Sequence, residues 1–247
     1  MSYLTNKEFL LEVAKGKVAG HTLVRRFGIN ADVDIAAEED ICSYGGIVNW
    51  QTSAQTLEAV STDADDLSAT GTGARTIKVW GLDSAYAEAN TTVSMNGVTP
   101  VTLSGTWIDI DRAEILTTGS TASNEGDIDV RILSAGAILA RVPTLYGQAY
   151  RAGYFVPTGK TAYLIGWESS LYKATSGSAE LRLYTAEDGV GWRVQAIQEL
   201  TQTGAGVSSA SAQSLLLELP AKTRVVVRAK ASVDNLGVAS SLTFVVI

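Results

Sequence analysis

Cysteine and histidine are almost absent from this chain of 247 residues, which has one of each, Cys42 and His21. A single cysteine excludes an internal disulfide framework. Zinc sites take several His or Cys ligands, and nucleophilic triads need an imidazole beside the nucleophile. We read Cys42 as a small buried residue. The sequence therefore predicts neither a zinc centre nor Ser-His or Cys-His catalysis, and we expect no enzyme.

Long apolar runs are also missing, and none approaches the roughly 20 residues that span a bilayer. The N-terminus MSYLTNKEFLLEVAKGK lacks the apolar core of a secretory signal, so classical export is not expected. The net charge of −7 leaves no excess of basic residues for gripping a phosphate backbone. We expect a soluble protein with no membrane and no nucleic acid among its partners.

A nucleotide cofactor is not expected either, although the stretch 157–161 (PTGKT) superficially resembles a phosphate-binding loop. That motif needs a glycine where Tyr154 stands and a helix after it, whereas AYLIGW reads as a strand. Gly71-Thr-Gly73 likewise precedes a strand. Both segments are predicted to be turns, and we assign no cofactor.

Charge is distributed unevenly along the chain. Residues 1–30 have five Lys or Arg against two acids, whereas residues 31–66 have nine acids and no Lys or Arg. Such asymmetry is typical of a basic arm followed by an acidic patch that docks on another protein. We therefore treat residues 1–37 as an N-terminal arm.

The arm contains the one helix that the sequence predicts, over residues 5–19. Thr5 followed by Glu8 matches a capping box. The apolar side of this short helix must pack on something. We expect it to anchor the arm on a partner through Phe9, Leu10 and Val13. Arg25 and Arg26 are expected to pair with acids of that partner, and removal of residues 1–30 is expected to leave the body folded.

From Ile47 onward the sequence predicts strand after strand. Ile77 and Val79 alternate with polar neighbours, and Asn96-Gly97 predicts a hairpin turn. Later strands are expected over 161–167, 179–185, 192–200, 214–219, 223–230 and 241–247. About a dozen short strands without βαβ spacing indicate an all-β, jelly-roll-like antiparallel β-sandwich. We place this body at 38–247 and leave open a subdivision near 141–153.

Acidic residues form two sets that offer oxygen ligands to a metal. Asp63, Asp65 and Asp66 lack the glycine and glutamate of an EF-hand loop. Acids on the faces of two predicted strands would meet if those strands pair: Asp109, Asp111, Glu125, Asp127 and Asp129. They would then form either a solvated outer face, which we favour, or a Ca²⁺ site. We assign no metal.

Two tryptophans, Trp80 and Trp107, fall on the polar faces of their predicted strands. Aromatic residues on an outward face indicate a contact with another subunit or a platform for stacking sugars. We favour the subunit contact, and a covering loop of the same chain is a third possibility. Trp192 alternates with apolar residues and is predicted to lie in the core.

The motifs, taken in order, resemble a recurrent pattern of virion structural proteins from short-tailed and marine tailed phages. Over residues 38–132 the resemblance is carried by EEDICSYGG, by TGTGARTIKVWGLDSAYAEANTTVSMNGVTPVTL and by IDRAEILTTGSTASNEGDI. GYFVPTGKTAYL and LPAKTRVVVRAKASVDN extend it more loosely. The chain departs from this pattern at Cys42-Ser43-Tyr44. The resemblance implies a particle component without catalytic residues.

Together these observations predict a capsid decoration (cement) protein. It would be made in the host cytoplasm and located on the capsid surface of the virion. It would bind the major capsid protein as a homo-oligomer, which we expect to be a trimer. The alternative is a carbohydrate-binding module of a tail fibre or baseplate, with Trp80 or Trp107 as its platform. A polysaccharide-degrading enzyme has the least support.

Overall fold

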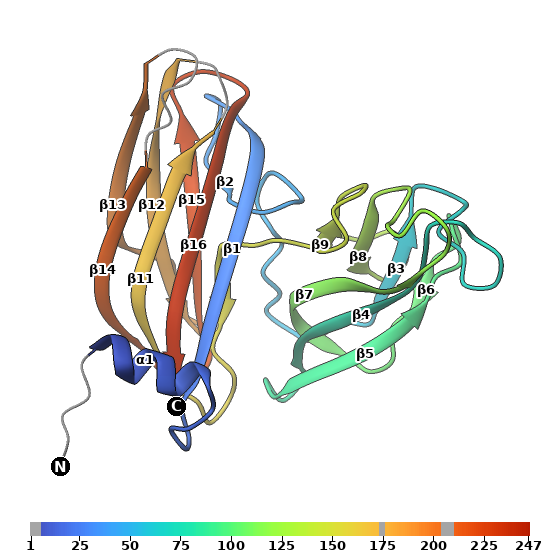
Figure 1. Ribbon diagram of the computed structural model, residues 1–247, viewed down its shortest axis with the longest axis horizontal. Coiled ribbons are helices and arrows are strands. Elements are labelled where there is room, and N and C mark those ends of the chain that lie inside the picture. Colours follow the sequence, from blue (N-terminus) through green and yellow to red (C-terminus); the bar gives the residue numbers. More distant parts are fainter. Residues whose placement is uncertain (1–5, 173–175, 204–209) are drawn as a thin grey trace.

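The computed structural model describes residues 6–172, 176–203 and 210–247. In these residues the chain is nearly all β, with antiparallel sheets and one short N-terminal helix, which confirms the predicted fold class. Figure 1 shows two β lobes side by side, a tall one and a smaller one. No helix in the described part of the chain is long and apolar enough to cross a membrane.

The helix comes first along the chain, and the strands follow it. The elements are α1 (Asn6–Ala14), β1 (Thr22–Val33), β2 (Glu39–Asp40), β3 (Leu57–Ser61), β4 (Ala74–Asp83), β5 (Glu88–Ser94), β6 (Val101–Thr102), β7 (Trp107–Thr118), β8 (Ile128–Ile132), β9 (Ile138–Val142), β10 (Gly153–Phe155), β11 (Ala162–Leu171), β12 (Gly177–Glu187), β13 (Arg193–Gln202), β14 (Ala210–Leu219), β15 (Thr223–Ala231) and β16 (Leu236–Val246).

The larger lobe is a sandwich of two sheets. One sheet has the strand order β1-β16-β11-β14, and the other has the order β10-β15-β12-β13, with β2 paired to β15. Both sheets contribute to one apolar core, in which Trp167 and Phe244 are among the largest fully buried side chains. Burial of this apolar area is the main stabilising contribution to the lobe.

The smaller lobe is inserted into the larger one. Its sheets, β6-β3-β8-β9 and β5-β4-β7, enclose a second core that includes Leu57, Ile77 and Trp107. The chain therefore passes from the larger lobe to the smaller one after β2 and returns before β10. The return passage lies in the segment 141–153, where the sequence left a subdivision open.

The N-terminal segment differs from the expected arm through residue 37. Strand β1 pairs with the C-terminal strand β16, from Thr22 opposite Val246 to Val33 opposite Leu236. Gly28 lets β1 pass close to the following chain, because a Cβ there would lie 1.8 Å from the carbonyl oxygen of Ile41. Residues 22–33 are thus an integral strand of the larger sandwich.

The turn at Asn96-Gly97 is present, but it does not make the predicted hairpin. Gly97 has a φ of 57°, the left-handed conformation that glycine adopts without strain. The strands on its two sides pair elsewhere, since β5 pairs with β4 and β6 pairs with β3. The turn therefore takes the chain from one sheet of the smaller sandwich to the other.

Glu58 on β3 holds the turn between β8 and β9. Ser134 and Ala135 in that turn have φ values of 67° and 58°, which are unfavourable for residues with a side chain. The buried Glu58 carboxylate accepts hydrogen bonds from both of their N–H groups, at 3.2 and 3.1 Å, and from Nε of Arg131 at 2.8 Å. Burial disfavours the charged carboxylate, but these hydrogen bonds favour it more strongly, so the pKa of Glu58 is lowered.

We expect Glu58→Gln to lower the free energy of unfolding by ~1–3 kcal/mol at pH 7, because buried donors lose a charged acceptor. A carboxylate with a lowered folded-state pKa stabilises the protein above its ordinary pKa, and that contribution disappears as pH falls through the lowered value. The difference from wild type should therefore shrink below about pH 4.5. Urea unfolding across pH measures this difference, and a constant value down to pH 3 would contradict it.

Candidate functional site

The predicted anchor residues of the helix lie against the chain itself to different degrees. Val13 is only 3% exposed, and α1 contacts β1. Phe9 and Leu10 are half-buried, and the ring of Phe9 meets His21 edge-on at 5.8 Å. Leu11, which was not among the predicted anchors, is exposed. Val13 is therefore already used within the chain, whereas Phe9 and Leu10 keep part of their surface free.

The two arginines that were expected to pair with a partner have partners within the chain. Arg26 forms a two-pronged ion pair with Asp111 of β7, with Nε at 2.7 Å from Oδ1, and so joins the two lobes. Arg25 approaches Glu168 at 3.1 Å, with the two side chains 63% and 62% exposed. An exposed pair of this kind contributes little to stability. Arg25 alone thus remains accessible to a partner.

The prediction of two outward-facing tryptophans is wrong for Trp107. Its ring is buried in the core of the smaller lobe, and its Nε1 donates a hydrogen bond to the carbonyl oxygen of Ser104 at 3.1 Å. Trp80 is half-buried, with the Arg112 guanidinium 4.0 Å and the Lys78 ammonium 5.0 Å from its ring centre. Cations of the same chain therefore lie against the ring for which we favoured a subunit contact over a stacked sugar.

Trp192, predicted to lie in the core, is half-buried. The guanidinium of Arg228 lies 5.0 Å from its ring centre, and Trp50 meets it edge-on at 5.6 Å.

Asp109 and Asp111 of β7 do not form the expected solvated outer face, because arginines pair with them. Asp109 is buried between the lobes and receives two hydrogen bonds from Arg151, at 3.0 and 2.5 Å. Burial raises the pKa of Asp109, and the positive charge of Arg151 opposes that rise. The Arg151 guanidinium also lies 4.5 Å from the ring centre of Trp50. Sequence reasoning missed this pair because Arg151 is on the return passage, far from Asp109 in sequence.

A second buried pair lies within the larger lobe, between β2 and β15. Asp40 accepts hydrogen bonds at 2.8 Å from Nε of Arg228 and from the N–H of Val48. Its neighbour Cys42 is buried, and burial raises the pKa of the thiol to about 12. A thiol with this pKa has almost no thiolate near neutral pH, so Cys42 is a poor nucleophile.

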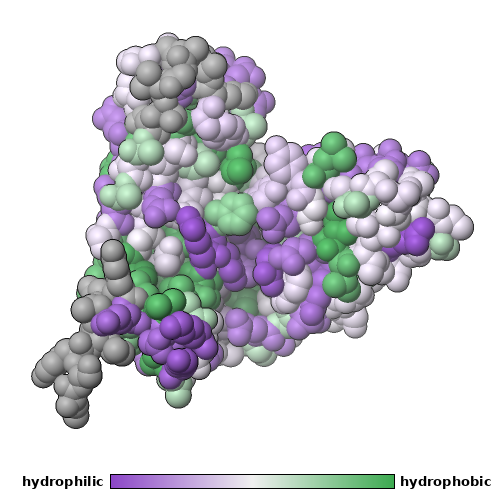
Figure 2. Space-filling view, viewed as in Figure 1, coloured by the Kyte–Doolittle hydropathy of each residue, from purple (hydrophilic) through white to green (hydrophobic). Residues whose placement is uncertain are grey.

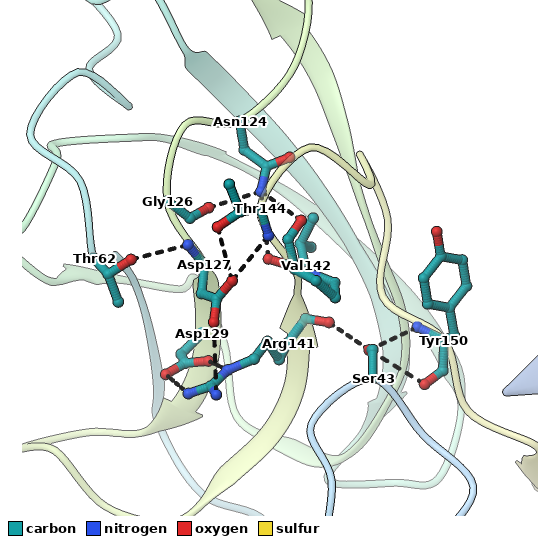
Figure 3. Close-up of polar contacts among 11 residues, drawn as sticks. Ser43, Thr62, Asn124, Gly126, Asp127, Asp129, Arg141, Val142, Thr144 and Tyr150 are labelled. Atoms are coloured by element: carbon teal, nitrogen blue, oxygen red, sulfur yellow. Dashed lines mark hydrogen bonds and ion pairs between the residues drawn. The ribbon is translucent and has the colours of Figure 1, made fainter. Parts of the chain in front are cut away.

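The acids of β8 and the preceding loop are also paired within the chain (Figure 3). Asp129 accepts two hydrogen bonds from Arg141, at 2.6 and 2.8 Å. Asp127 accepts hydrogen bonds from the N–H and the hydroxyl of Thr144, at 2.8 and 3.0 Å. Asn124 donates to the carbonyl oxygens of Gly126 and Pro143, both at 2.7 Å. These contacts fasten the return passage to the smaller lobe.

Ser43 lies in the first passage, the segment that leads from β2 to the smaller lobe, and it links this segment to the return passage (Figure 3). Its hydroxyl donates to the carbonyl oxygen of Arg141 at 2.6 Å and accepts from the N–H of Tyr150 at 3.0 Å. The backbone N–H of Ser43 donates to the carbonyl oxygen of Tyr150 at 2.9 Å. The EEDICSYGG motif, which carried the sequence resemblance, is thus part of the junction between the lobes.

One group of acids has no arginine among it. Ligand atoms of Asp63, Asp65 and Glu125 lie within 4.8 Å of one another on the surface of the smaller lobe. Asp66 is buried instead and accepts hydrogen bonds from the N–H groups of Ala74 and Gly126. Acidic clusters at the surface are common without an ion, and no other feature of the described residues assigns a metal to this one.

The junction also bounds a cleft, and the molecular surface is recessed between the two lobes (Figure 2). The cleft has a volume of about 470 Å³, within the range of ligand-binding pockets. It is lined by the end of β1, by the first passage, by the return passage and by four tyrosines: Tyr44, Tyr146, Tyr150 and Tyr172. Three acids also line it: Asp32, Asp34 and Glu39. This cleft is the candidate binding site of the molecule, and the sequence did not predict it.

Comparisons with known proteins do not assign the chain to a family. No protein-family model matches the chain, and no curated protein matches its sequence. Among solved structures, the chain is similar to the VP2 subviral particle of infectious bursal disease virus, at 11% identity and a TM-score of 0.25. It is similar to the structure of the Gx strain of that virus at 12% identity and the same TM-score. Each alignment covers 92% of this chain and 72% of the other. Scores this low carry no argument about fold or function.

Proposed function

We propose that this chain is a structural component of a tailed-phage virion, a capsid decoration protein that binds and stabilises the major capsid shell. It acts as a homo-oligomer, a trimer, and carries out no catalysis. The sequence resemblance supports this assignment. The observation that carries it is an open edge of the larger sandwich, which is suited to contact with other protein.

That edge is formed by the end strands β13 and β14, which lie side by side in Figure 1. Among the described strands, β14 pairs with β11 alone. Its ten residues include a single charge, Glu218, and Leu216 is 85% exposed. Soluble proteins usually protect such edges with charges, proline or bulges, because an unprotected edge pairs with other chains. We place the contact between copies at this edge, in place of Trp107.

Oligomerisation gives the capsid contact its strength. Several copies of a modest contact on one oligomer bind a repeating shell much more tightly than one copy does. Phe9, Leu10 and Arg25 remain the residues proposed to meet the capsid protein. Val13 and Arg26 are left out because they are engaged within the chain.

We expect Leu216→Glu to convert the oligomer to monomers, because it places a charge in an apolar contact. Leu145→Glu is the matched control, since Leu145 is 71% exposed in the return passage, away from β14. Light scattering coupled to gel filtration measures the mass of both variants. A monomeric wild type, or an oligomer that survives Leu216→Glu, would refute the placement of this contact.

Sedimentation with capsids that lack the protein tests the capsid role. Wild type should pellet with the capsids and raise the temperature at which they open, and Phe9→Asp/Leu10→Asp should remain in the supernatant while staying folded. Capsids that neither bind the wild type nor gain stability would refute the proposal.

The alternative is a carbohydrate-binding module of a tail fibre or baseplate, and the four tyrosines of the cleft favour it over the other classes. The two tryptophans predicted to stack on sugars are not available for it, because Trp107 is buried and the Trp80 ring is covered by cations. Binding of host-surface glycans that is lost in Tyr146→Ala, in an otherwise intact oligomer, would favour this alternative.

A further inference from the structure

The charge of the cleft between the lobes is not balanced within the chain. Asp32, Asp34 and Glu39 line it, and neither lysine nor arginine does. No ion pair of the described residues involves these three acids. Elsewhere the chain pairs buried acids with arginines, as in Asp40–Arg228 and Asp109–Arg151. The cleft therefore carries negative charge that no cation of its lining balances.

The aromatic walls of the cleft are held in place by contacts with one another and with residues outside the cleft. Tyr150 packs on Phe27 with ring centres 5.0 Å apart and meets Tyr146 edge-on at 5.7 Å. Arg141 lies 5.4 Å from the ring centre of Tyr44. The outer rings remain accessible, since Tyr146 is 60% exposed and Tyr172 is 44% exposed. Burial raises the pKa of Tyr172 to about 12, so its phenol stays neutral.

The floor of the cleft is fixed as well. The Glu39 carboxylate accepts hydrogen bonds from Nδ2 of Asn30 at 2.7 Å and from the N–H of Gly46 at 3.3 Å. Gly45 and Gly46 have φ values of 77° and 66°, so the turn that positions this donor requires glycine. A site whose groups are held before binding loses less conformational entropy when a ligand enters.

We propose that this cleft binds an arginine or lysine side chain presented by a segment of a partner protein. The carboxylates supply charge-assisted hydrogen bonds, and the exposed rings of Tyr146 and Tyr172 supply cation–π contacts, which arginine makes more often than lysine. An anionic ligand is repelled by the three acids. A neutral saccharide would stack on the same rings but would leave the negative charge uncompensated. The inference rests on the proposed function only for the identity of the partner.

The test uses the full-length protein and a labelled peptide, acetyl-Gly-Arg-Gly-Arg-Gly-amide, with fluorescence anisotropy as the readout. The control peptide has citrulline in place of both arginines, which keeps the shape of the side chain and removes its charge. We expect the arginine peptide to bind at least about tenfold more tightly than the citrulline peptide and to weaken as salt is added.

Variants inside and outside the cleft test whether the arginine peptide binds there. Asp32→Asn/Asp34→Asn and Tyr146→Ala should each weaken the arginine peptide by about tenfold. Glu88→Gln/Glu187→Gln removes the same charge from exposed positions outside the cleft and away from β14, and it should change affinity by less than about twofold. Equal affinity for the two peptides would overturn the proposal, as would equal effects of the two double variants.

Two further outcomes separate this proposal from others. Maltotriose that competes with the arginine peptide, and whose own binding is lost in Tyr146→Ala, would assign the cleft to a saccharide and overturn the proposal. Capsid binding that is normal in Asp32→Asn/Asp34→Asn would overturn it as the docking site and leave the decoration function standing.

Discussion

Replacing Arg151 by methionine is expected to lower the free energy of unfolding by about 3–5 kcal/mol, because it leaves the carboxylate of Asp109 buried without its cation. Both side chains are almost fully buried between the lobes, and their two hydrogen bonds are 3.0 and 2.5 Å long. Removing one partner of such a pair costs much more than the pair itself contributes. Urea unfolding at pH 7 measures the loss.

Two control variants test whether the loss of stability comes from the unpaired buried charge. Arg25→Met removes an exposed arginine from its pair with Glu168 and should cost no more than about 0.5 kcal/mol. Asp109→Leu/Arg151→Met removes both buried charges and should recover much of the stability lost in Arg151→Met. A loss in Arg151→Met no larger than that in Arg25→Met would show that the junction does not depend on this pair.

Two N-terminal truncations are expected to differ strongly in the stability of the folded protein. Removal of residues 1–20 deletes α1 and leaves β1 in place, so the protein should remain folded with modest loss of stability. Removal of residues 1–30 deletes most of β1, including its pairing with β16 and the Arg26–Asp111 contact between the lobes. That truncation should abolish cooperative unfolding of the larger sandwich. The expectation that residues 1–30 are dispensable is thereby withdrawn.

Circular dichroism melting and limited proteolysis distinguish the two truncations. The shorter one should melt in one cooperative transition and resist protease. The longer one should yield a protease-resistant fragment no larger than the smaller lobe, residues 47–149. A melting curve of the longer truncation that matches the full-length protein would contradict the placement of β1.

The alternation of apolar and polar residues correctly located most strands in the second half of the chain. The expected strands at 161–167, 179–185 and 223–230 fall within, or within one residue of, β11, β12 and β15. Alternation works for β11 and β12 because one face of each strand contributes to a core while the other is partly exposed. It specifies the strand but not its partner, so the assignment of sheets could not follow from it.

Alternation failed at the start of β7, where both faces of the strand are covered. Trp107 and Ile110 point into the core of the smaller lobe, whereas Ile108 packs with Phe155 of the larger lobe and Asp109 pairs with Arg151. Four successive buried residues leave no outward face for the rule to recognise. Trp107 was placed outside for this reason.

The strand β1 and the cleft were missed for a related reason. Strand β1 is stabilised by a partner at the other end of the chain, and no local pattern records that pairing. The cleft gathers Asp32, Tyr44 and Tyr146 from three separate stretches. Its one signal in the sequence was the acidic run at 31–66 without lysine or arginine, from which we predicted a docking surface but not the tyrosines of the cleft.

The proposal that the chain decorates a capsid is tested most directly by its copy number on the mature particle, measured by quantitative mass spectrometry against the major capsid protein. A decoration role predicts a constant ratio set by the capsid lattice, unchanged in particles whose tails have been removed. A copy number that matches the symmetry of the tail, and that disappears with the tail, would contradict it.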